Sequence, residues 1–220
     1  MKWRRFWLTS SVIQLGAGCI EPFFGKRFIK KLRQKTKMIN PKILKPKVMD
    51  ELRSGFRDNN PKGVQVQGFM DAESYREFLA AVANAGFKKS EIRDMHSYFE
   101  ANVAALKFFN SKGFLSFASA VTGKKFRKAT CSLRMFMYGS YTLLHDYLEK
   151  GRVEFFFDMT SKWNNSSGGA TVLLTDEGEK LMLPPAPNTL VIGESGKSYV
   201  KRVNHLADND GRLIVYGILD

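Results

Sequence analysis

The sequence predicts an α+β fold in which helices come first and an antiparallel β-sandwich or jelly roll follows. Amphipathic helical patterns lie ahead of Cys131, and short β-rich runs separated by Gly, Pro, Asn and Asp fill the chain after it. Short strands at close spacing, without helices between them, are typical of sandwiches and jelly rolls. Helices gathered before the strands favour an arrangement in which they pack on one face of the sheet.

The composition is that of a globular protein. A length of 220 residues corresponds to one or two domains, and a hydrophobic content of 44% supplies a core, which argues against a disordered chain. Cys19 and Cys131 are the only cysteines, and no CxxC motif is present. A disulfide framework or a structural zinc site is therefore not expected, and a reducing compartment is favoured.

Residues 1–38 form a basic N-terminal extension that we place outside the folded domain. They hold ten Lys and Arg against one acid, Glu21, and so account for nine of the fourteen net positive charges of the chain. Such a segment attracts phosphate groups or anionic lipids without specificity, which suggests RNA, a ribosome or an anionic membrane as partners. A solvated basic tail is the simpler alternative.

The first 24 residues leave the localisation open. A charged start followed by the apolar stretch 6–20 has the layout of a secretory signal, and Cys19 stands near a faint lipoprotein cleavage pattern. A basic, acid-poor start also fits an organelle transit peptide. Trp3, Phe6 and Trp7 suit an amphipathic helix at a membrane surface. Targeting and membrane association are both compatible with this segment.

Three helices are predicted ahead of the strands. The first follows Pro46, because Val48, Leu52 and Phe56 recur at helical spacing. The second begins at Asp71, a predicted N-cap, and ends near Gly86. Its apolar face consists of Tyr75, Phe78, Leu79 and Val82. The third is predicted over residues 96–121, with an apolar face of Phe114, Leu115, Ala118 and Val121.

The predicted strands are short and bounded by turn residues. A first strand is expected from the alternation of Val and Gln at 64–67, after the turn cluster at 59–63. The others are 131–138, 141–145, 152–159, 170–175, 180–183, 189–193, 197–203 and 212–219.

Five motifs of the C-terminal half occur in an order that resembles one family. They are Tyr138-Gly139 followed by His145, Gly151-Arg152, Trp163 with Gly168-Gly169, Pro187-Asn188-Thr189-Leu190-Val191, and Arg212. Together they resemble the prolyl-hydroxylase-like branch of the 2-oxoglutarate/Fe(II) dioxygenases, and most closely the peptidyl prolyl hydroxylases that act on ribosomal or other proteins. The resemblance covers residues 39–220. It implies one domain of N-terminal helices packed on a double-stranded β-helix, a form of jelly roll.

The resemblance also implies a cofactor site. In the family, two His and one carboxylate hold Fe(II) and leave positions open for 2-oxoglutarate and oxygen. His145 stands where the first metal ligand is expected. Arg212 matches the basic residue that pairs with the distal carboxylate of 2-oxoglutarate, and Tyr138 matches a residue that contacts this cosubstrate. The substrate would be a protein or a peptide.

The carboxylate ligand departs from the family pattern. It is expected two residues after His145, but Tyr147 stands there. Asp146 is adjacent, and in a regular strand its side chain points to the opposite face from that of His145. A β-bulge would re-aim Asp146 toward the metal, so it is retained as a candidate ligand.

The second histidine and the surroundings of Arg212 depart as well. The expected histidine position holds Lys201, or Val200 after a shift of one, and a protonated lysine has no lone pair for a metal. His205 follows too late in the sequence and serves only if the loop rearranges. Ile214 replaces the small hydroxyl residue that the family has two places after the arginine.

Two functions of different classes follow. The first is an oxygenase that uses Fe(II) and 2-oxoglutarate to hydroxylate a protein, with Asp146 or His205 recruited as unusual ligands. The second is a non-catalytic relative, without either cofactor, whose jelly roll binds protein, RNA or a membrane. No GxSxG motif or P-loop lysine pattern is present to support a hydrolase or nucleotide-binding enzyme.

Overall fold

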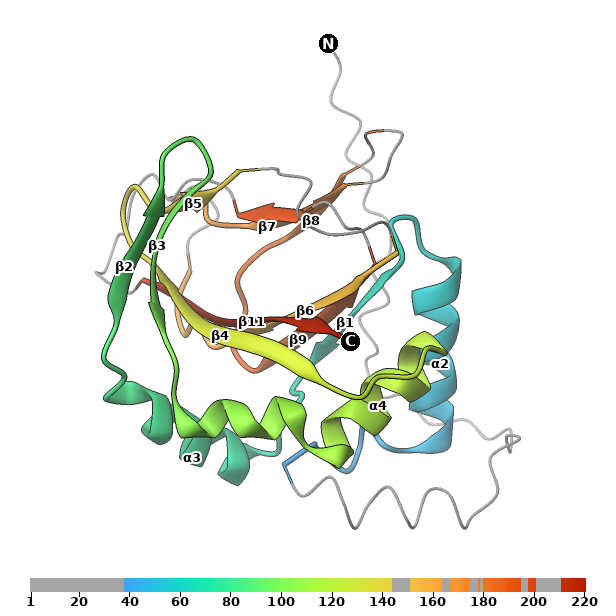
Figure 1. The fold of residues 1–220 in the computed structure, drawn as a ribbon. Coiled ribbons are helices and arrows are strands. Elements are labelled where there is room, and N and C mark those ends of the chain that lie inside the picture. The colour runs from blue at the N-terminus through green and yellow to red at the C-terminus, as the bar shows by residue number, and fades with distance from the viewer. Residues whose placement is uncertain are drawn as a thin grey trace.

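The structure is a computed structural model that describes residues 38–143, 151–163, 167–174, 178, 180–194, 198–200 and 211–220. Two curved layers of strands face each other, and helices cover the outer side of the larger one (Figure 1). The helices are α2 (Pro46–Asp58), α3 (Ala72–Ala83), the 3₁₀ helix η1 (Ala104–Asn110) and α4 (Lys112–Thr122). The first six strands are β1 (Gly63–Gln67), β2 (Lys88–Ile92), β3 (His96–Ala101), β4 (Ala129–Phe136), β5 (Tyr141–Thr142) and β6 (Val153–Asp158). The others are β7 (Thr171–Leu174), β8 (Lys180–Leu183), β9 (Thr189–Gly193), β10 (Ser198–Val200) and β11 (Arg212–Leu219).

The strands form two antiparallel sheets. The larger sheet has eight strands in the order β1-β9-β6-β11-β4-β3-β2, with β5 paired to β3, and the smaller one has the order β10-β7-β8. Strands that are adjacent in the larger sheet are mostly not consecutive in the sequence. Strands from the two ends of the domain alternate within the sheet, as in a jelly roll. The predicted α+β class, with helices ahead of a jelly roll, is confirmed.

Two of the predicted helices form where the sequence places them. Helix α2 has Pro46 in its first turn, where the missing N–H costs nothing, and it buries Val48, Leu52 and Phe56. Helix α3 begins after Asp71, whose side chain accepts hydrogen bonds from the N–H groups of Glu73 (3.1 Å) and Ser74 (3.0 Å). The capping prediction for Asp71 is confirmed.

The third helix prediction is wrong over its first part. Residues 96–101 form strand β3 instead, and the helical part is divided into η1 and α4 at Ser111, whose hydroxyl caps α4. Tyr98 and Phe99 favour a strand, and Phe99–Ala101 gain cross-strand partners on β4. Strand β2, which pairs with β3, was not predicted, because its Lys and Glu residues lack an apolar alternation.

The predicted strands of the C-terminal half match the structure closely. The predictions at 180–183, 189–193 and 212–219 coincide with β8, β9 and β11. Those at 131–138, 152–159 and 170–175 are each shifted or shortened by one or two residues. Parts of the predicted strands at 141–145 and 197–203 lie outside the described residues.

The core has two parts, one on each side of the larger sheet. Phenylalanine rings fill the space between this sheet and the helices, with Phe109, Phe114 and Phe155 packed 5.0 to 5.1 Å apart between ring centroids. A smaller cluster lies between the two sheets and includes Phe136, Phe156, Leu173, Val191 and Ile214. The inner space of the jelly roll is therefore lined by both apolar and polar side chains. Within the described part of the chain, no helix has the length and apolar character needed to cross a membrane.

Candidate functional site

The strand register places the polar side chains of the jelly roll interior. Ile214 of β11 pairs with Asp158 of β6, and Asp158 in turn pairs with Thr189 of β9. Because side chains alternate along a strand, Arg212 and Ile214 point to the same face as Asp158. This face looks toward the smaller sheet, since Ile214 belongs to the apolar cluster between the sheets.

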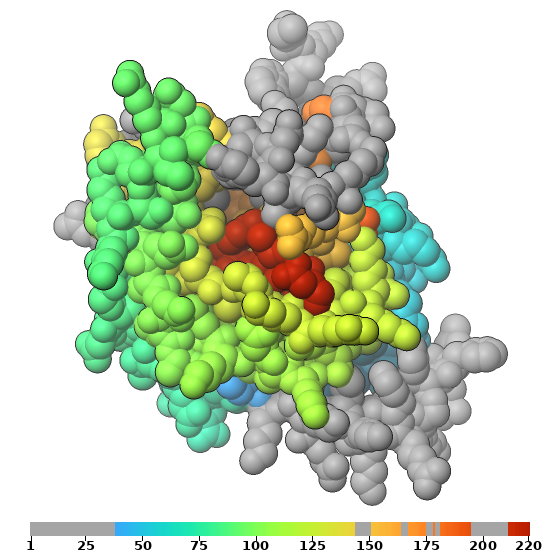
Figure 2. Space-filling model, viewed as in Figure 1, coloured from blue at the N-terminus to red at the C-terminus, as the bar shows by residue number. Residues whose placement is uncertain are grey.

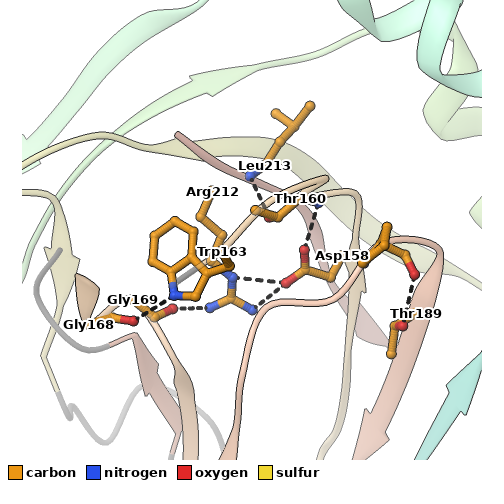
Figure 3. A network of polar contacts seen from close by, with 9 residues as sticks. Asp158, Thr160, Trp163, Gly168, Gly169, Thr189, Arg212 and Leu213 are labelled. Carbon is orange, nitrogen blue, oxygen red and sulfur yellow. Dashed lines mark hydrogen bonds and ion pairs between the residues drawn. The ribbon is translucent and has the colours of Figure 1, made fainter. Parts of the chain in front are cut away.

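Arg212 is buried in this interior, between Asp158 and the Gly169 carbonyl (Figure 3). Its side chain is only 2% exposed. Nε donates to Asp158 Oδ2 (2.9 Å), Nη2 lies 2.9 Å from the same oxygen, and Nη1 donates to the Gly169 carbonyl (2.6 Å). All three guanidinium nitrogens therefore have an acceptor from the protein itself.

Asp158 is held equally firmly. Its Oδ1 accepts a hydrogen bond from the Thr160 N–H (2.9 Å), and the Thr160 hydroxyl oxygen accepts from the Leu213 N–H (3.2 Å). Burial raises the pKa of Asp158, whereas the Arg212 guanidinium and the hydrogen bonds from Thr160 act in the opposite direction. A buried charge without its partner is costly, so the two side chains depend on each other.

The motif of Trp163 and Gly168-Gly169 contains the carbonyl that accepts a hydrogen bond from Arg212. Trp163 Nε1 donates to the Gly168 carbonyl (3.1 Å). Gly169 has a φ of +64°, and a Cβ there would collide with the Trp163 ring. Glycine is therefore required at this place, both for the backbone conformation and for the close approach of the indole. The motif positions the Gly169 carbonyl that receives Arg212.

Of the other predicted site residues, Tyr138 alone lies in the described part of the chain. Tyr138 lies in the turn between β4 and β5, and the residue is 73% exposed. His145, Asp146 and His205 lie outside the described residues. Within the portion that the structure describes, no group of three or more His, Cys, Asp and Glu side chains is placed to hold a metal ion.

A second polar cluster of the inner face was not predicted. The Arg134 guanidinium lies between two tyrosine rings, with Cζ 4.6 Å from the centroid of Tyr98 and 4.1 Å from that of Tyr216. Its Nε donates to the Ser132 hydroxyl (3.2 Å). Burial and the neighbouring carboxylate of Glu154 raise the pKa of Tyr216. These residues come from four neighbouring strands, β3, β4, β6 and β11.

The sequence of β6 contains one signal that pointed to the polar residues of the interior that were not predicted. Strand β6 reads Val-Glu-Phe-Phe-Phe-Asp, and the period of two places Glu154, Phe156 and Asp158 on one face. All six residues of the strand are buried. Two acids within a strand that is buried on both sides need cationic or hydroxyl partners, which predicts partners for Glu154 and Asp158 without naming them.

The pattern of the family described as oxoglutarate and iron-dependent oxygenase degradation C-term matches residues 19–186, which is most of the chain. The chain belongs to this oxygenase family. The resemblance inferred from the motifs is thereby confirmed at the level of the 2-oxoglutarate/Fe(II) oxygenase superfamily. No curated protein matches the sequence.

Solved structures agree with the family at the level of the fold. An oxidoreductase of the 2OG-Fe(II) oxygenase family from Burkholderia pseudomallei has a TM-score of 0.63 and 12% identity, over 78% of this chain and 90% of that one. A prolyl-4-hydroxylase from Pseudomonas putida has a TM-score of 0.61 and 15% identity, over 76% and 97%. A prolyl hydroxylase from Trichoplax adhaerens, solved with a peptide fragment of the hypoxia inducible factor oxygen degradation domain, has a TM-score of 0.61 and 15% identity, over 89% and 93%.

Members of the oxygenase family use Fe(II) and 2-oxoglutarate, so the described residues can be tested for their fit to the cosubstrate. Arg212 is the residue that would receive the distal carboxylate. Three of its five guanidinium N–H groups are already engaged by Asp158 and Gly169. A cosubstrate carboxylate would therefore have to compete with Asp158 for this arginine, which makes Arg212 a poor fit to the role.

Proposed function

We propose that this oxygenase-family protein acts as a binding module rather than as a hydroxylase. The observation that carries the proposal is the pairing of Arg212 with Asp158 and the Gly169 carbonyl, because the motif resemblance assigns this arginine to the distal carboxylate of the cosubstrate. In this protein the arginine stabilises the fold from within. The jelly roll is kept as a scaffold for binding.

The energy of the buried pair supports the proposal. Breaking a buried ion pair by removing one partner typically costs roughly 3–5 kcal/mol, because an uncompensated charge is left behind. If 2-oxoglutarate took Arg212 from Asp158, the Asp158 carboxylate would be left without a cation in the interior. That penalty corresponds to a loss of about two to four orders of magnitude in affinity for the cosubstrate.

The residues at the expected metal-ligand positions also support a binding module rather than a hydroxylase. Tyr147 stands at the place of the carboxylate ligand, and Lys201 at the place of the second histidine. A protonated lysine cannot donate a lone pair to a metal. These departures come from the sequence alone and are independent of the contacts around Arg212.

The partner that we propose for the module is an extended protein segment. One structural neighbour, the prolyl hydroxylase from Trichoplax adhaerens, was solved with a peptide fragment. It shares the fold over 89% of this chain. A domain of this shape that has lost the reaction would retain a surface suited to a peptide.

The test is a titration of the metal-free full chain with Fe(II) under argon in the presence of 2-oxoglutarate. The readout is the visible charge-transfer band of the Fe(II)–2-oxoglutarate chelate, with circular dichroism to show that the protein is folded. We expect no saturable band in the wild-type protein. A saturable band that disappears in His145→Ala would overturn the proposal and establish the oxygenase.

A matched pair of variants sharpens this test. Asp158→Asn keeps the shape of the side chain but removes the charge that competes for Arg212, so we expect it to bind 2-oxoglutarate better than the wild type. Asp220→Asn neutralises the acid of the exposed ion pair with Arg152 (2.7 Å) and should leave 2-oxoglutarate binding unchanged. Equal behaviour of the two variants would show that Asp158 is not what excludes the cosubstrate.

A further inference from the structure

One long segment of the chain contains no acidic residue. Between Glu100 and Asp146 the sequence has no Asp or Glu, although it has seven Lys and Arg. They are Lys107, Lys112, Lys124, Lys125, Arg127, Lys128 and Arg134. In the structure this segment includes η1, α4 and the loop that leads to β4.

The fold brings most of these cations to one side of the molecule. The Asn110 side chain holds the backbone of Ala129 at both its N–H (2.8 Å) and its carbonyl, which fixes the end of η1 against the start of β4. Lys107 and Lys112 flank Asn110 in sequence, and Lys128 precedes Ala129. The lime and yellow-green atoms of this segment form a band across the lower part of the face shown in Figure 2.

Five of the cations form what we call the basic face. They are Lys107, Lys112, Lys125, Arg127 and Lys128, and all five are exposed. Among the residues that the structure describes, none of the five has an acidic partner within 4.0 Å. Two acids of this region are engaged with other cations, Glu194 with Lys124 (3.0 Å) and Asp220 with Arg152 (2.7 Å).

Some exposed cations elsewhere have an acid close by in the sequence, as Arg57 is paired with Asp58 (2.7 Å) and Lys89 with Glu91 (2.7 Å). Others, such as Lys42 and Lys62, have no ion pair among the described residues, but the stretch between Glu100 and Asp146 is distinguished by its lack of any acid. Five unpaired cations on one face repel one another and generate a local positive potential. A partner that supplies several anionic groups at regular spacing would offset this repulsion.

We propose that the basic face binds the phosphate backbone of RNA without reading its bases. The large apolar side chains that are exposed in the described structure are Ile92, Tyr138, Leu143 and Met182, and none of them belongs to η1, α4 or the following loop. Stacking of bases needs exposed aromatic rings, and stable attachment to a membrane needs apolar groups to insert beside the charges. A face that offers only cations suits a row of phosphates.

This inference concerns a surface distinct from the jelly roll interior and does not rest on the proposed function. Its test uses the full chain and a fluorescent oligouridylate, with the dissociation constant measured by anisotropy at several salt concentrations. The first variant carries Lys125→Gln, Arg127→Gln and Lys128→Gln. The control carries Lys88→Gln, Lys89→Gln and Arg93→Gln, which remove the same charge from exposed positions around β2.

Both variants keep the basic N-terminal extension, so its contribution is the same in each. We expect the affinity to fall about tenfold or more in the basic-face variant and to change little in the control. The slope of log K against log salt should become shallower by about 2 in the basic-face variant, since each phosphate contact on a single strand contributes about 0.7. Equal affinity of the two variants would overturn the inference.

A second arm separates RNA from lipid. The wild type and both variants are mixed with vesicles that contain phosphatidylserine, and co-sedimentation is measured. We expect the wild type and both variants to bind the vesicles to the same extent, because any binding through the N-terminal extension is common to all three. If the wild type binds the vesicles and not the oligouridylate, and the basic-face variant loses that binding, the partner would be an anionic membrane and the proposal of RNA would be wrong.

Discussion

The guanidinium of Arg212 and the carboxylate of Asp158 meet in the interior of the jelly roll through two contacts of 2.9 Å to the same oxygen. The two residues begin β11 and end β6, which are neighbours in the larger sheet although 54 positions separate them in sequence. The pair therefore links the last strand, β11, to β6, and it engages the arginine that the motif resemblance predicts as the cosubstrate residue.

The first prediction concerns the stability that depends on this pair. Asp158→Ala leaves Arg212 buried without its counter-ion, so the free energy of unfolding should fall by roughly 3–5 kcal/mol. Urea unfolding followed by circular dichroism measures it. In the double variant Asp158→Leu with Arg212→Met neither charge is present, and we expect most of the loss to be recovered. Asp220→Ala, in an exposed pair, should cost no more than about 1 kcal/mol.

The second prediction concerns Gly169. Gly169→Ala places a Cβ against the Trp163 ring and forces alanine into the left-handed region at a φ of +64°. Gly123→Ala is the matched control, because Gly123 has a φ of +75° with open space around its Cβ position. The control should lose about 1–2 kcal/mol from its backbone conformation alone. Gly169→Ala should lose clearly more, and equal losses in thermal or urea unfolding would show that the Trp163 contact is unimportant.

The third prediction concerns the cap of α3 and its dependence on pH. Hydrogen bonds from Ser74 and Glu73 hold the pKa of Asp71 below its usual range. This contribution to stability is present above the unfolded pKa of about 3.9 and is lost as the pH falls through the lower folded pKa. Asp71→Ala should cost about 1 kcal/mol at pH 7.

Asp71→Asn is the control for that prediction. Asparagine keeps the hydrogen-bond acceptor of the cap but does not titrate, so this variant should be close to the wild type in stability at pH 7. The difference in unfolding free energy between the wild type and Asp71→Asn should shift in favour of the variant as the pH approaches 3. A difference that stays constant from pH 7 to pH 3 would contradict the assigned shift.

The fourth prediction concerns the thiol of Cys131. Burial raises its pKa to about 11, so at pH 8 only about one molecule in a thousand carries the reactive thiolate. In a Cys19→Ser variant, which leaves Cys131 as the one cysteine, alkylation by iodoacetamide should be slow in the native protein and fast in denaturant. Complete labelling of the native protein within the time taken by the denatured protein would contradict a buried thiol.

Much of the fold followed from local patterns in the sequence. The spacing of Val48, Leu52 and Phe56 predicted α2, and Asp71 predicted the start of α3. The turn residues of the C-terminal half divided it into strands at nearly the observed boundaries. Strand β2 was missed because its Lys and Glu residues lack an apolar alternation, and β3 was missed because residues 96–101 were included in the predicted helix over 96–121. Tyr98 is buried only because β3 pairs with β4 in the folded sheet.

The candidate site was predictable only in part. The place of Arg212 at the start of the last strand followed from the motif order, but its partner did not. Asp158 meets Arg212 because β11 lies between β4 and β6, and this strand order cannot be read from a local pattern. The same holds for Arg134, which lies between Tyr98 and Tyr216 because three strands distant in sequence are adjacent in the sheet.

The most direct test follows the Nε–H signal of Arg212 by ¹⁵N NMR while 2-oxoglutarate is added to the full chain. The signal is assigned by its absence in Arg212→Lys. If Asp158 holds the guanidinium, the signal should be protected from exchange with water and should keep its chemical shift at saturating 2-oxoglutarate. A saturable shift of this signal in the wild-type protein would show that the cosubstrate reaches Arg212, and it would contradict the proposed loss of the family reaction.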